Sequence, residues 1–337
     1  MARWAAPVPF RSLVMVTPKG IGKFASGSSI MKPSSKRNSP PMTGSLCQTT
    51  IHATVPRPLT MPIYNHVIHN GQIIPKEKAC FPVYTPALVG ALGVYETILV
   101  KGGRYVALHE HLERLFHSAA GAQLRLQVDM EKLVTWAYQV VEANAPDGLV
   151  RVLAMDLGNG HADVFLYEMG YIAPTPEEYA QGVPVILYHG ERAMPLIKSF
   201  NTLVPGLARK AAKAAGVHDA LLVDRHGHVT EGSNCNVFIV QDGVLAAPPL
   251  GAVLEGTVMR RVMALAQELS IPFQRRPLPA SDIPRWGEVF LTSTRRGVLP
   301  VRRVGDVEIG PPGPITRQLM EAYRAWEAEE LAKPPPS

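Results

Sequence analysis

Residues 230–238 have the sequence TEGSNCNVF, a turn that leads into a strand, and the segments around this stretch decide the fold class. On both sides of it, short apolar strands alternate with amphipathic helices. Strands are predicted at 183–188, 219–223, 236–240 and 288–291, and helices at 204–215, 257–269 and 314–332. Many short strands with a few helices are typical of a mixed, partly barrel-like α+β domain.

The sequence before residue 173 predicts a second, smaller unit. Hairpins are predicted around Asn70-Gly71 (63–74) and around Gly102-Gly103 (95–107), followed by amphipathic helices at 110–124 and 129–144 and strands at 149–155 and 163–169. Prolines at 174 and 176 interrupt the pattern, so we expect a linker at 173–182. The predicted fold is α+β with two domains, a small α/β domain at 61–177 and a larger, partly barrel-like domain at 178–332.

The first 60 residues differ from the rest in composition. They contain eight basic residues, eight prolines and no acidic residue, and they show no sustained helix or strand period. We expect a disordered leader at 1–60, either an upstream start in place of Met61, which we favour, or an organelle transit segment. Residues 61–337 then contain 26 basic and 28 acidic residues, so the basicity belongs to the leader and does not indicate a nucleic-acid partner.

Cysteine and histidine spacing predicts neither a disulfide framework nor a metal site. Cys47, Cys80 and Cys235 are far apart and odd in number, which is typical of a reducing, cytoplasmic setting. His109 and His111 lie two positions apart at a predicted helix start, which is not the spacing of a zinc pair on a helix. No apolar run approaches the roughly 20 residues of a membrane-spanning helix. We therefore expect a cytoplasmic protein without metal, membrane or nucleic-acid partners.

Lys198 is the first candidate for chemistry because it follows the apolar sequence Ala-Met-Pro-Leu-Ile at 193–197. Burial disfavours the ammonium form and lowers the pKa of a lysine, which is what reaction with an aldehyde requires. A lysine that keeps its charge in water while its stem covers apolar residues is the more common arrangement. Lys198 therefore needs support from other segments.

Three further segments carry groups that can bind an aromatic aldehyde cofactor with a ring nitrogen and a phosphate. A carboxylate at Glu231 pairs with a protonated ring nitrogen or is an ordinary turn residue in water. Thr257 and Val258 begin a predicted helix after Gly256, where free amides bind phosphate, although an ordinary N-cap has the same sequence. Thr294 follows a predicted strand and offers a hydroxyl group.

Arg114 has two interpretations in the sequence. It follows Glu110 by four positions, which predicts a surface ion pair along a helix. Alternatively, its guanidinium binds a phosphate through two parallel hydrogen bonds.

Taken together, these segments resemble the class IV aminotransferases, which are pyridoxal-phosphate enzymes of fold type IV. The resemblance covers about residues 62–325 and rests on six motifs in the family's order, GVYET (93–97), HEHLERL (109–115), IKSFN (197–201), EGSNCNVF (231–238), LEGT (254–257) and EVFLTST (288–294). It implies pyridoxal 5'-phosphate as cofactor, Lys198 as the catalytic residue that forms the Schiff base, and Glu231 beside the pyridine nitrogen. It also implies a homodimer, a substrate-facing Tyr95, and a phosphate site made by Arg114, Thr257, Val258 and Thr294.

The resemblance implies a transaminase that moves an amino group between an amino acid, preferably a branched-chain one, and a 2-oxo acid such as 2-oxoglutarate. The alternatives are a D-amino-acid transaminase, a 4-amino-4-deoxychorismate lyase and a non-catalytic cofactor-binding protein. Glu96 favours the transaminases over the lyase, whereas the sequence of 197–201 is closer to the D-amino-acid and lyase branches.

Two segments depart from the branched-chain enzymes. Arg295 and Arg296 stand where those enzymes have small residues and then an acid, and we expect solvated surface arginines or, for one of them, a contact to the carboxylate of an acidic substrate. Residues 156–160 also differ, and the sequence assigns them no role.

Overall fold

The computed structural model describes residues 62–334. The predicted leader at 1–60 lies outside the described residues. The described part of the chain belongs to one compact unit by its contacts. The boundary expected near residue 177 separates two sheets, described in turn below, and as a domain boundary it stays a prediction.

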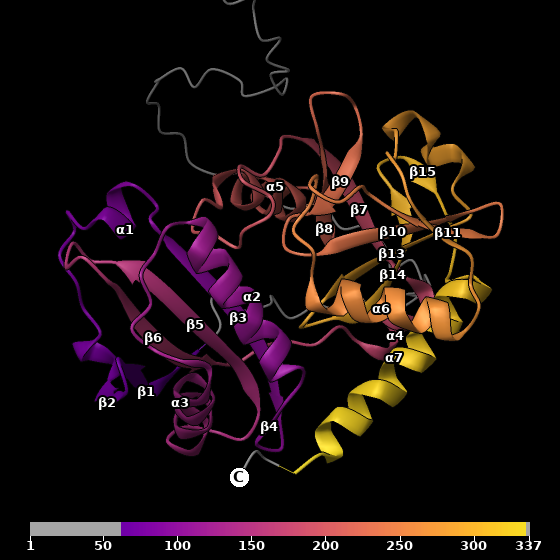
Figure 1. Ribbon diagram of the computed structural model, residues 1–337. Helices are drawn as coiled ribbons and strands as arrows, with labels where there is room; N and C mark the ends of the chain where they lie inside the picture. The colour runs from indigo at the N-terminus through magenta and orange to yellow at the C-terminus, as the bar shows by residue number, and fades with distance from the viewer. Residues whose placement is uncertain (1–61, 335–337) are drawn as a thin grey trace, which may run out of the picture. The chain divides into compact units, whose positions relative to one another are not determined.

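The first sheet has six antiparallel strands in the order β2-β1-β6-β5-β3-β4. Its strands are β1 (Ile63–His69), β2 (Gln72–Pro75), β3 (Gly93–Lys101), β4 (Arg104–Tyr105), β5 (Gly148–Asp156) and β6 (Ala162–Met169). Short helical turns η1 (Lys76–Lys78) and α1 (Pro86–Val89) precede β3, and helices α2 (Leu108–Gly121) and α3 (Met130–Glu142) pack on the sheet (Figure 1). Ile98, Leu112 and Leu133 are buried in the core between the strands and these helices, because the helices turn one apolar stripe toward the sheet.

The second sheet contains a closed barrel. Its strands are β7 (Val183–His189), β8 (Asp219–Val223), β9 (Val229–Gly232), β10 (Asn236–Gln241), β11 (Val244–Ala247), β12 (Phe273–Arg275), β13 (Glu288–Ser293), β14 (Gly297–Val304) and β15 (Val307–Glu308). Hydrogen-bonded neighbours follow one another from β10 through β13, β14, β7 and β8 to β9. The ring closes where Asn236 of β10 pairs with Glu231 of β9. The fold is therefore α+β with a barrel-like second sheet, as predicted.

Helices cover the barrel on several sides. They are α4 (Pro176–Gln181), α5 (Leu203–Ala214), α6 (Thr257–Glu268), the 3-10 segment η2 (Ala280–Arg285) and α7 (Pro314–Ala332). Phe238 and Phe290 stack at 5.1 Å between the sheet and helices α6 and α7, in a core that also contains Met259 and Leu319. Figure 1 shows α6 across the barrel and α7 extending toward the first sheet.

The structure adds to one local prediction and contradicts another. The segment expected as a linker at 173–182 contains helix α4, which is started by a reciprocal capping box between Thr175 and Glu178, and its role as a linker stays a prediction. Glu231, expected in a turn, lies on strand β9, because residues 229–232 pair across β8 and β10.

The two sheets meet through the segment that carries Lys198. The Tyr95 amide donates to the Lys198 carbonyl at 2.9 Å, and the Phe200 amide donates to the Gly93 carbonyl at 2.8 Å. A Cβ at Gly93 would lie 2.3 Å from the Phe200 ring, so this close approach requires glycine. The segment thus runs as an added edge along the start of β3.

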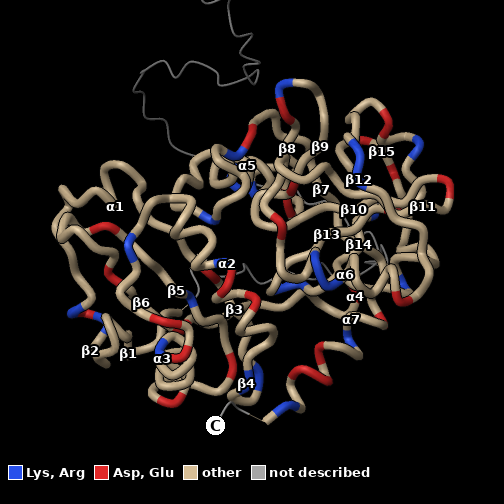
Figure 2. The backbone as a smooth tube through the Cα atoms, viewed as in Figure 1, with Lys and Arg blue, Asp and Glu red and all other residues tan. Residues whose placement is uncertain are grey.

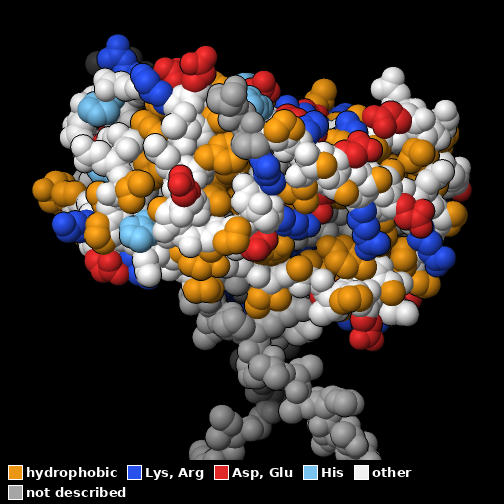
Figure 3. Space-filling view, turned by 90° about the horizontal axis from the view of Figure 1, so that it is seen from below, with side chains coloured by type: hydrophobic (Ala, Val, Ile, Leu, Met, Phe, Trp, Pro, Cys, Tyr) orange, Lys and Arg blue, Asp and Glu red, His pale blue; other side chains and the backbone are white. Residues whose placement is uncertain are grey.

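Two further features concern the length of the helices and the side chains on one face of the molecule. Residues 62–334 contain no helix long and apolar enough to cross a membrane. The face in Figure 3 shows acidic, basic and hydrophobic side chains interspersed with one another.

Candidate functional site

A cavity of about 70 Å³ opens between the two sheets and gathers most of the predicted site residues. Its lining includes Tyr95, Arg114, Lys198, Glu231, Thr257, Val258 and Thr294. Arg295, also predicted, lies instead on an adjoining cavity of about 220 Å³ that shares Tyr95 and Lys198 with the first. The structure therefore brings residues from β3, α2, the loop before α5, β9, α6 and the end of β13 to one place.

Lys198 lies in a setting that favours its neutral amine. Its Nζ is 4.8 Å from the centroid of the Tyr95 ring, and its backbone amide donates to Ser118 Oγ at 3.1 Å. Burial lowers the pKa of Lys198, and the positive charge of Arg114 lowers it further, while Tyr95 opposes both. The Lys198 ammonium in turn lowers the pKa of the Tyr95 hydroxyl against the effect of burial.

Glu231 has a partner that the sequence did not predict. Arg192 Nε donates to Glu231 Oε1 at 2.6 Å, and both side chains are almost fully buried. The arginine fixes the direction of the carboxylate and supplies a counter-charge for it. Arg192 lies in an ordinary loop sequence, with no pattern in the chain that would single it out.

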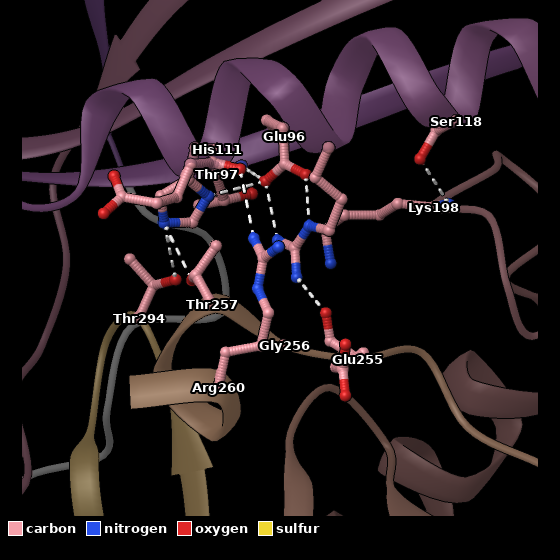
Figure 4. A network of polar contacts seen from close by, with 12 residues as sticks. Glu96, Thr97, His111, Ser118, Lys198, Glu255, Gly256, Thr257, Arg260 and Thr294 are labelled. Atoms are coloured by element: carbon pink, nitrogen blue, oxygen red, sulfur yellow. Dashed lines mark hydrogen bonds and ion pairs between the residues drawn. The ribbon is translucent and has the colours of Figure 1, made fainter. Parts of the chain in front are cut away.

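Glu96 is the centre of a second buried network (Figure 4). Its carboxylate, which is 0% exposed, accepts from Arg114 Nε at 2.6 Å, from Arg114 Nη2 at 2.8 Å and from His111 Nδ1 at 2.8 Å. Burial alone would raise the pKa of Glu96, but the charges and hydrogen bonds of Arg114 and His111 lower it far below its usual range. The predicted surface pair between Arg114 and Glu110 is wrong, because the arginine turns inward.

The Nε and Nη2 atoms of Arg114, which could bind a phosphate through two parallel hydrogen bonds, therefore already donate to the Glu96 carboxylate. Its Nη1 also donates to the Glu255 carbonyl at 3.1 Å. A guanidinium has five N–H donors, so about two remain for an anion in the cavity. A phosphate in the cavity would therefore bind the remaining N–H groups of Arg114, whose position is fixed by Glu96, and not the Nε and Nη2 pair.

Helix α6 begins at the cavity with its first amides uncapped by a side chain. Its N-cap is Gly256, and Thr257 and Val258 open the first turn. Asn236 fixes this turn, because its Nδ2 donates to the Leu254 carbonyl at 2.7 Å and its Oδ1 accepts from the Gly256 amide at 3.1 Å. A Cβ at Gly256 would lie 2.3 Å from that oxygen, so glycine is required here too.

The two arginines after Thr294 differ in their surroundings. Arg296 is 4% exposed, and its Nη2 lies 2.8 Å from Asp219 Oδ2, so the expectation of a solvated surface arginine is wrong for this residue. Arg295 is half-buried, and burial together with Arg296 and Arg209 lowers its pKa to about 10. Asp219 neutralises the charge of Arg296, and of these two arginines it is Arg295 that lines the 220 Å³ cavity.

Further cations surround the same space. Arg151 of β5 lies 4.9 Å from the Tyr95 ring centroid, and its buried Nε has no hydrogen-bond partner among the described residues. Arg209 of α5 lines the same 220 Å³ cavity as Arg151 and Arg295. Figure 2 shows the basic positions on β5, α2 and α5 that approach one another between the two sheets.

The donor set fits pyridoxal phosphate, the cofactor that the resemblance implies. The cavity offers an amine with a lowered pKa, a buried carboxylate at Glu231, and hydroxyls and free amides at the start of α6. Thr292 Oγ1 and Arg192 Nη1 line it and are buried without a partner among the described residues, and such groups require a ligand or water.

Comparison with known families gives a match over most of the chain. Residues 93–304 match the model of the family described as amino-transferase class IV. A putative branched-chain-amino-acid aminotransferase of Methanocaldococcus jannaschii is 30% identical over 76% of this chain and 94% of its own length. A D-alanine aminotransferase of Bacillus licheniformis is 28% identical over 79% of this chain and 99% of its own.

Solved structures give the same result for the fold. The branched-chain aminotransferase of Thermoproteus uzoniensis, solved with norvaline, superimposes with a TM-score of 0.74 at 27% identity over 80% of this chain and 96% of that one. The T.th. branched-chain amino acid aminotransferase, solved with N-(5'-phosphopyridoxyl)-L-glutamate, gives 0.72 at 27% identity over 79% and 95% of the two chains.

Proposed function

The chain belongs to the class IV aminotransferase family and is a pyridoxal-phosphate-dependent aminotransferase, and we propose that it transfers the amino group of a branched-chain amino acid to 2-oxoglutarate. Lys198 is the proposed catalytic residue. The proposed cofactor ligands are Arg114, Glu231, Thr257, Val258 and Thr294 together with Lys198. Tyr95 and Arg295 are proposed to face the substrate.

Each proposed ligand has a defined task. When bound, pyridoxal phosphate supplies an electron-withdrawing ring that stabilises negative charge at the substrate's α-carbon. Glu231, held by Arg192 at 2.6 Å, keeps the ring nitrogen protonated. Thr257, Val258, Thr294 and the remaining donors of Arg114 bind the phosphate and fix the position of the ring.

Lys198 also moves a proton. Because burial lowers its pKa, a fraction of the amine is unprotonated and accepts the proton of the substrate's α-carbon on Nζ. The ring of Tyr95, 4.8 Å away, limits the directions that Nζ takes and excludes water from one side. The same nitrogen then returns the proton, which makes it both base and acid.

One observation carries the choice of a dicarboxylate acceptor. Arg151, Arg209 and Arg295 line one 220 Å³ cavity beside Lys198, and no acidic side chain is among that cavity's lining residues. A monocarboxylate substrate needs one such cation, whereas 2-oxoglutarate presents two carboxylates, each suited to a guanidinium. Leu149 and Met169 on the same wall offer the apolar contact that a branched side chain requires.

The test is a substrate panel on the purified holoenzyme. L-Leucine, L-valine, D-alanine and L-alanine are each supplied with 2-oxoglutarate, and glutamate is measured together with its configuration; L-leucine is also supplied with pyruvate, and alanine is measured. Formation of L-glutamate from leucine or valine supports the proposal. D-Glutamate from D-alanine would replace it with the second candidate below, and a dicarboxylate acceptor no better than pyruvate would remove the role of the arginines.

A D-amino-acid transaminase is the second candidate. The segment IKSFN at 197–201 is closer to that branch, and the D-alanine aminotransferase of Bacillus licheniformis is 28% identical, against 30% for the branched-chain relative from Methanocaldococcus jannaschii. A 4-amino-4-deoxychorismate lyase is separated from both by adding aminodeoxychorismate alone, since a lyase releases pyruvate without an amino acceptor.

We also propose a cytoplasmic homodimer. Met194, Leu196 and Leu203, around the Lys198 segment, are 60%, 59% and 71% exposed, which favours an apolar contact with a second copy. Cys80 and Cys235 are both unpaired, in agreement with a reducing compartment. Light scattering of the purified protein measures the mass directly, and a monomer at micromolar concentration would contradict the dimer.

A further inference from the structure

His111 is a buried residue that contacts Glu96 on one side and two threonines of the proposed phosphate site on the other. It is 1% exposed on α2, and its Nδ1 lies 2.8 Å from Glu96 Oε2. On the other side of the ring, Nε2 lies 3.1 Å from Thr257 Oγ1 and 3.5 Å from Thr294 Oγ1. Figure 4 shows the imidazole between the carboxylate and the two hydroxyls.

The hydrogen atoms of this network can be counted. Glu96 is ionised and only accepts, so the hydrogen of the His111 ring sits on Nδ1. In the neutral ring Nε2 is then an acceptor with one lone pair, which accepts the hydrogen of the nearer hydroxyl, Thr257 Oγ1 at 3.1 Å. Without an anion in the cavity, the hydrogen of the Thr257 hydroxyl is therefore used by the imidazole.

A phosphate changes this count. A phosphate dianion only accepts hydrogen bonds, and each threonine hydroxyl has one hydrogen to donate. Thr257 cannot direct the same hydrogen to His111 and to phosphate. If Nε2 carries a hydrogen, it donates to the Thr257 hydroxyl oxygen, and the hydroxyl hydrogens of Thr257 and Thr294 are then both available to the anion.

We infer that His111 takes up one proton when the cofactor phosphate binds and thereby turns the hydroxyl of Thr257 toward it. His111 is a positioning residue in this scheme, because it acts through Thr257. The inference rests on the phosphate site proposed above and adds a step of proton uptake to it.

The charges around His111 agree with such a change. Glu96 faces it from β3, Arg114 from the next turn of α2 and Lys198 from the loop before α5, while α6 and the turn after β13 present hydroxyls. Burial lowers the pKa of His111 in the ligand-free chain, where Arg114 and Lys198 also oppose its positive charge and Glu96 favours it. A dianion at the threonines adds negative charge on the side where none faces the ring, which raises that pKa.

Sulfate is the probe for the first test, because it is a tetrahedral dianion that does not itself titrate near neutral pH. It is titrated into the cofactor-free protein by calorimetry in buffers of different ionisation enthalpy. We expect uptake of about one proton per sulfate bound, and a dissociation constant that rises about tenfold per pH unit above the pKa of His111 in the ligand-free chain.

Three variants assign the proton. His111→Gln should abolish the uptake and make sulfate affinity independent of pH, with binding weakened about tenfold. His109→Gln, an exposed histidine on the same helix, should behave like the parent protein. Lys198→Ala should retain the uptake, since Lys198 is the other nearby group with a lowered pKa; loss of uptake in this variant assigns the proton to the lysine and overturns the inference.

The holoenzyme gives an independent test by ¹⁵N NMR of its histidine rings, which distinguishes the imidazolium from the neutral Nδ1–H form. We expect His111 as imidazolium with the cofactor bound and as the neutral ring without it. A neutral His111 in the holoenzyme, or sulfate binding without proton uptake, overturns the inference and leaves the phosphate site intact. A chain that does not bind sulfate overturns both, while the transaminase assignment is judged separately by the substrate panel.

Discussion

Nζ of Lys198 lies 4.8 Å from the ring centroid of Tyr95, and the guanidinium of Arg151 lies 4.9 Å from the same centroid. One aromatic ring thus contacts both the proposed catalytic amine of Lys198 and Arg151, an arginine that lines the proposed substrate cavity. A cation over an aromatic face is attracted to the ring by roughly 0.5–2 kcal/mol, more when water is excluded. Tyr95 therefore holds the amine and the arginine at a defined spacing in the cavity.

Lys198→Ala is expected to abolish transamination. The variant removes the amine that we propose takes the α-proton and retains the cofactor, so turnover should fall by at least about a thousandfold. Absorbance of the bound cofactor and the rate of glutamate formation measure both effects. Lys132→Ala, an exposed lysine on α3, is the matched control and should leave both unchanged. A Lys198→Ala protein that stays yellow and active would show that the catalytic lysine lies elsewhere.

Glu231→Gln should lower both activity and stability. The amide cannot fill the role that we propose for the carboxylate, pairing with a protonated ring nitrogen, and it leaves the buried Arg192 without a counter-charge. We expect turnover to fall about a hundredfold or more and the free energy of unfolding to fall by about 3 kcal/mol.

The chain offers a control for that variant in a nearby carboxylate. Glu191 pairs with Arg225 at 2.8 Å, but the two side chains are 36% and 74% exposed. Glu191→Gln should leave both the free energy of unfolding and the turnover number nearly unchanged, because an exposed ion pair contributes little. Equal effects of the two substitutions, measured by urea unfolding and steady-state kinetics, would mean that burial of the Glu231 pair is not what matters.

Arg295→Ala should weaken the binding of the amino acceptor 2-oxoglutarate and leave the binding of the amino donor unchanged. Loss of a charge-assisted hydrogen bond of about 1.5–3 kcal/mol raises the KM for 2-oxoglutarate by roughly ten- to a hundredfold. The KM for a branched-chain amino acid and for pyruvate should change little, because neither has a second carboxylate. Arg302→Ala, an exposed arginine on β14, is the control. Parallel changes for 2-oxoglutarate and pyruvate would exclude a specific role in binding the distal carboxylate.

Stability should fall with rising pH because of Glu168 on β6. Its side chain is 0% exposed, and burial raises the pKa of the carboxyl from 4.5 to about 7. A raised pKa means that the folded state prefers the proton, so this contribution is complete below pH 4.5 and is lost as the pH rises through 7. The loss amounts to about 3 kcal/mol at most. Urea unfolding between about pH 5 and 8.5 should show this slope in the parent protein and in Glu142→Gln, an exposed glutamate, and a flatter profile in Glu168→Gln.

Regular elements with a strong period could be predicted from the sequence. Helix α7 covers 314–332 and strand β8 covers 219–223, the ranges expected from their patterns of apolar residues. Strand β14 was not expected, because Pro300 stands in its middle and two arginines precede its last residue, Val304. Its pairing with β13 and β7 is determined by the barrel around it and not by its own sequence.

The site was predictable as a set of residues and not as a set of partners. Lys198, Glu231 and Thr257 have side chains whose chemistry is visible in the chain, and the cavity brings them together. The partners Arg192 for Glu231 and Glu96 for Arg114 are 39 and 18 positions away along the chain. Ion pairs of this kind depend on which strands and helices become neighbours, and only the tertiary fold determines that.

The barrel closes at a single pair, Asn236 opposite Glu231, and both residues line the cavity. Whatever ligand seats against these side chains therefore also bridges the seam of the barrel. Amide hydrogen exchange in β9 and β10 should consequently slow when the cofactor is added, and the melting temperature should rise with cofactor concentration. For this chain, binding of the cofactor would then stabilise the closure of the barrel as well as supply the chemistry of the site.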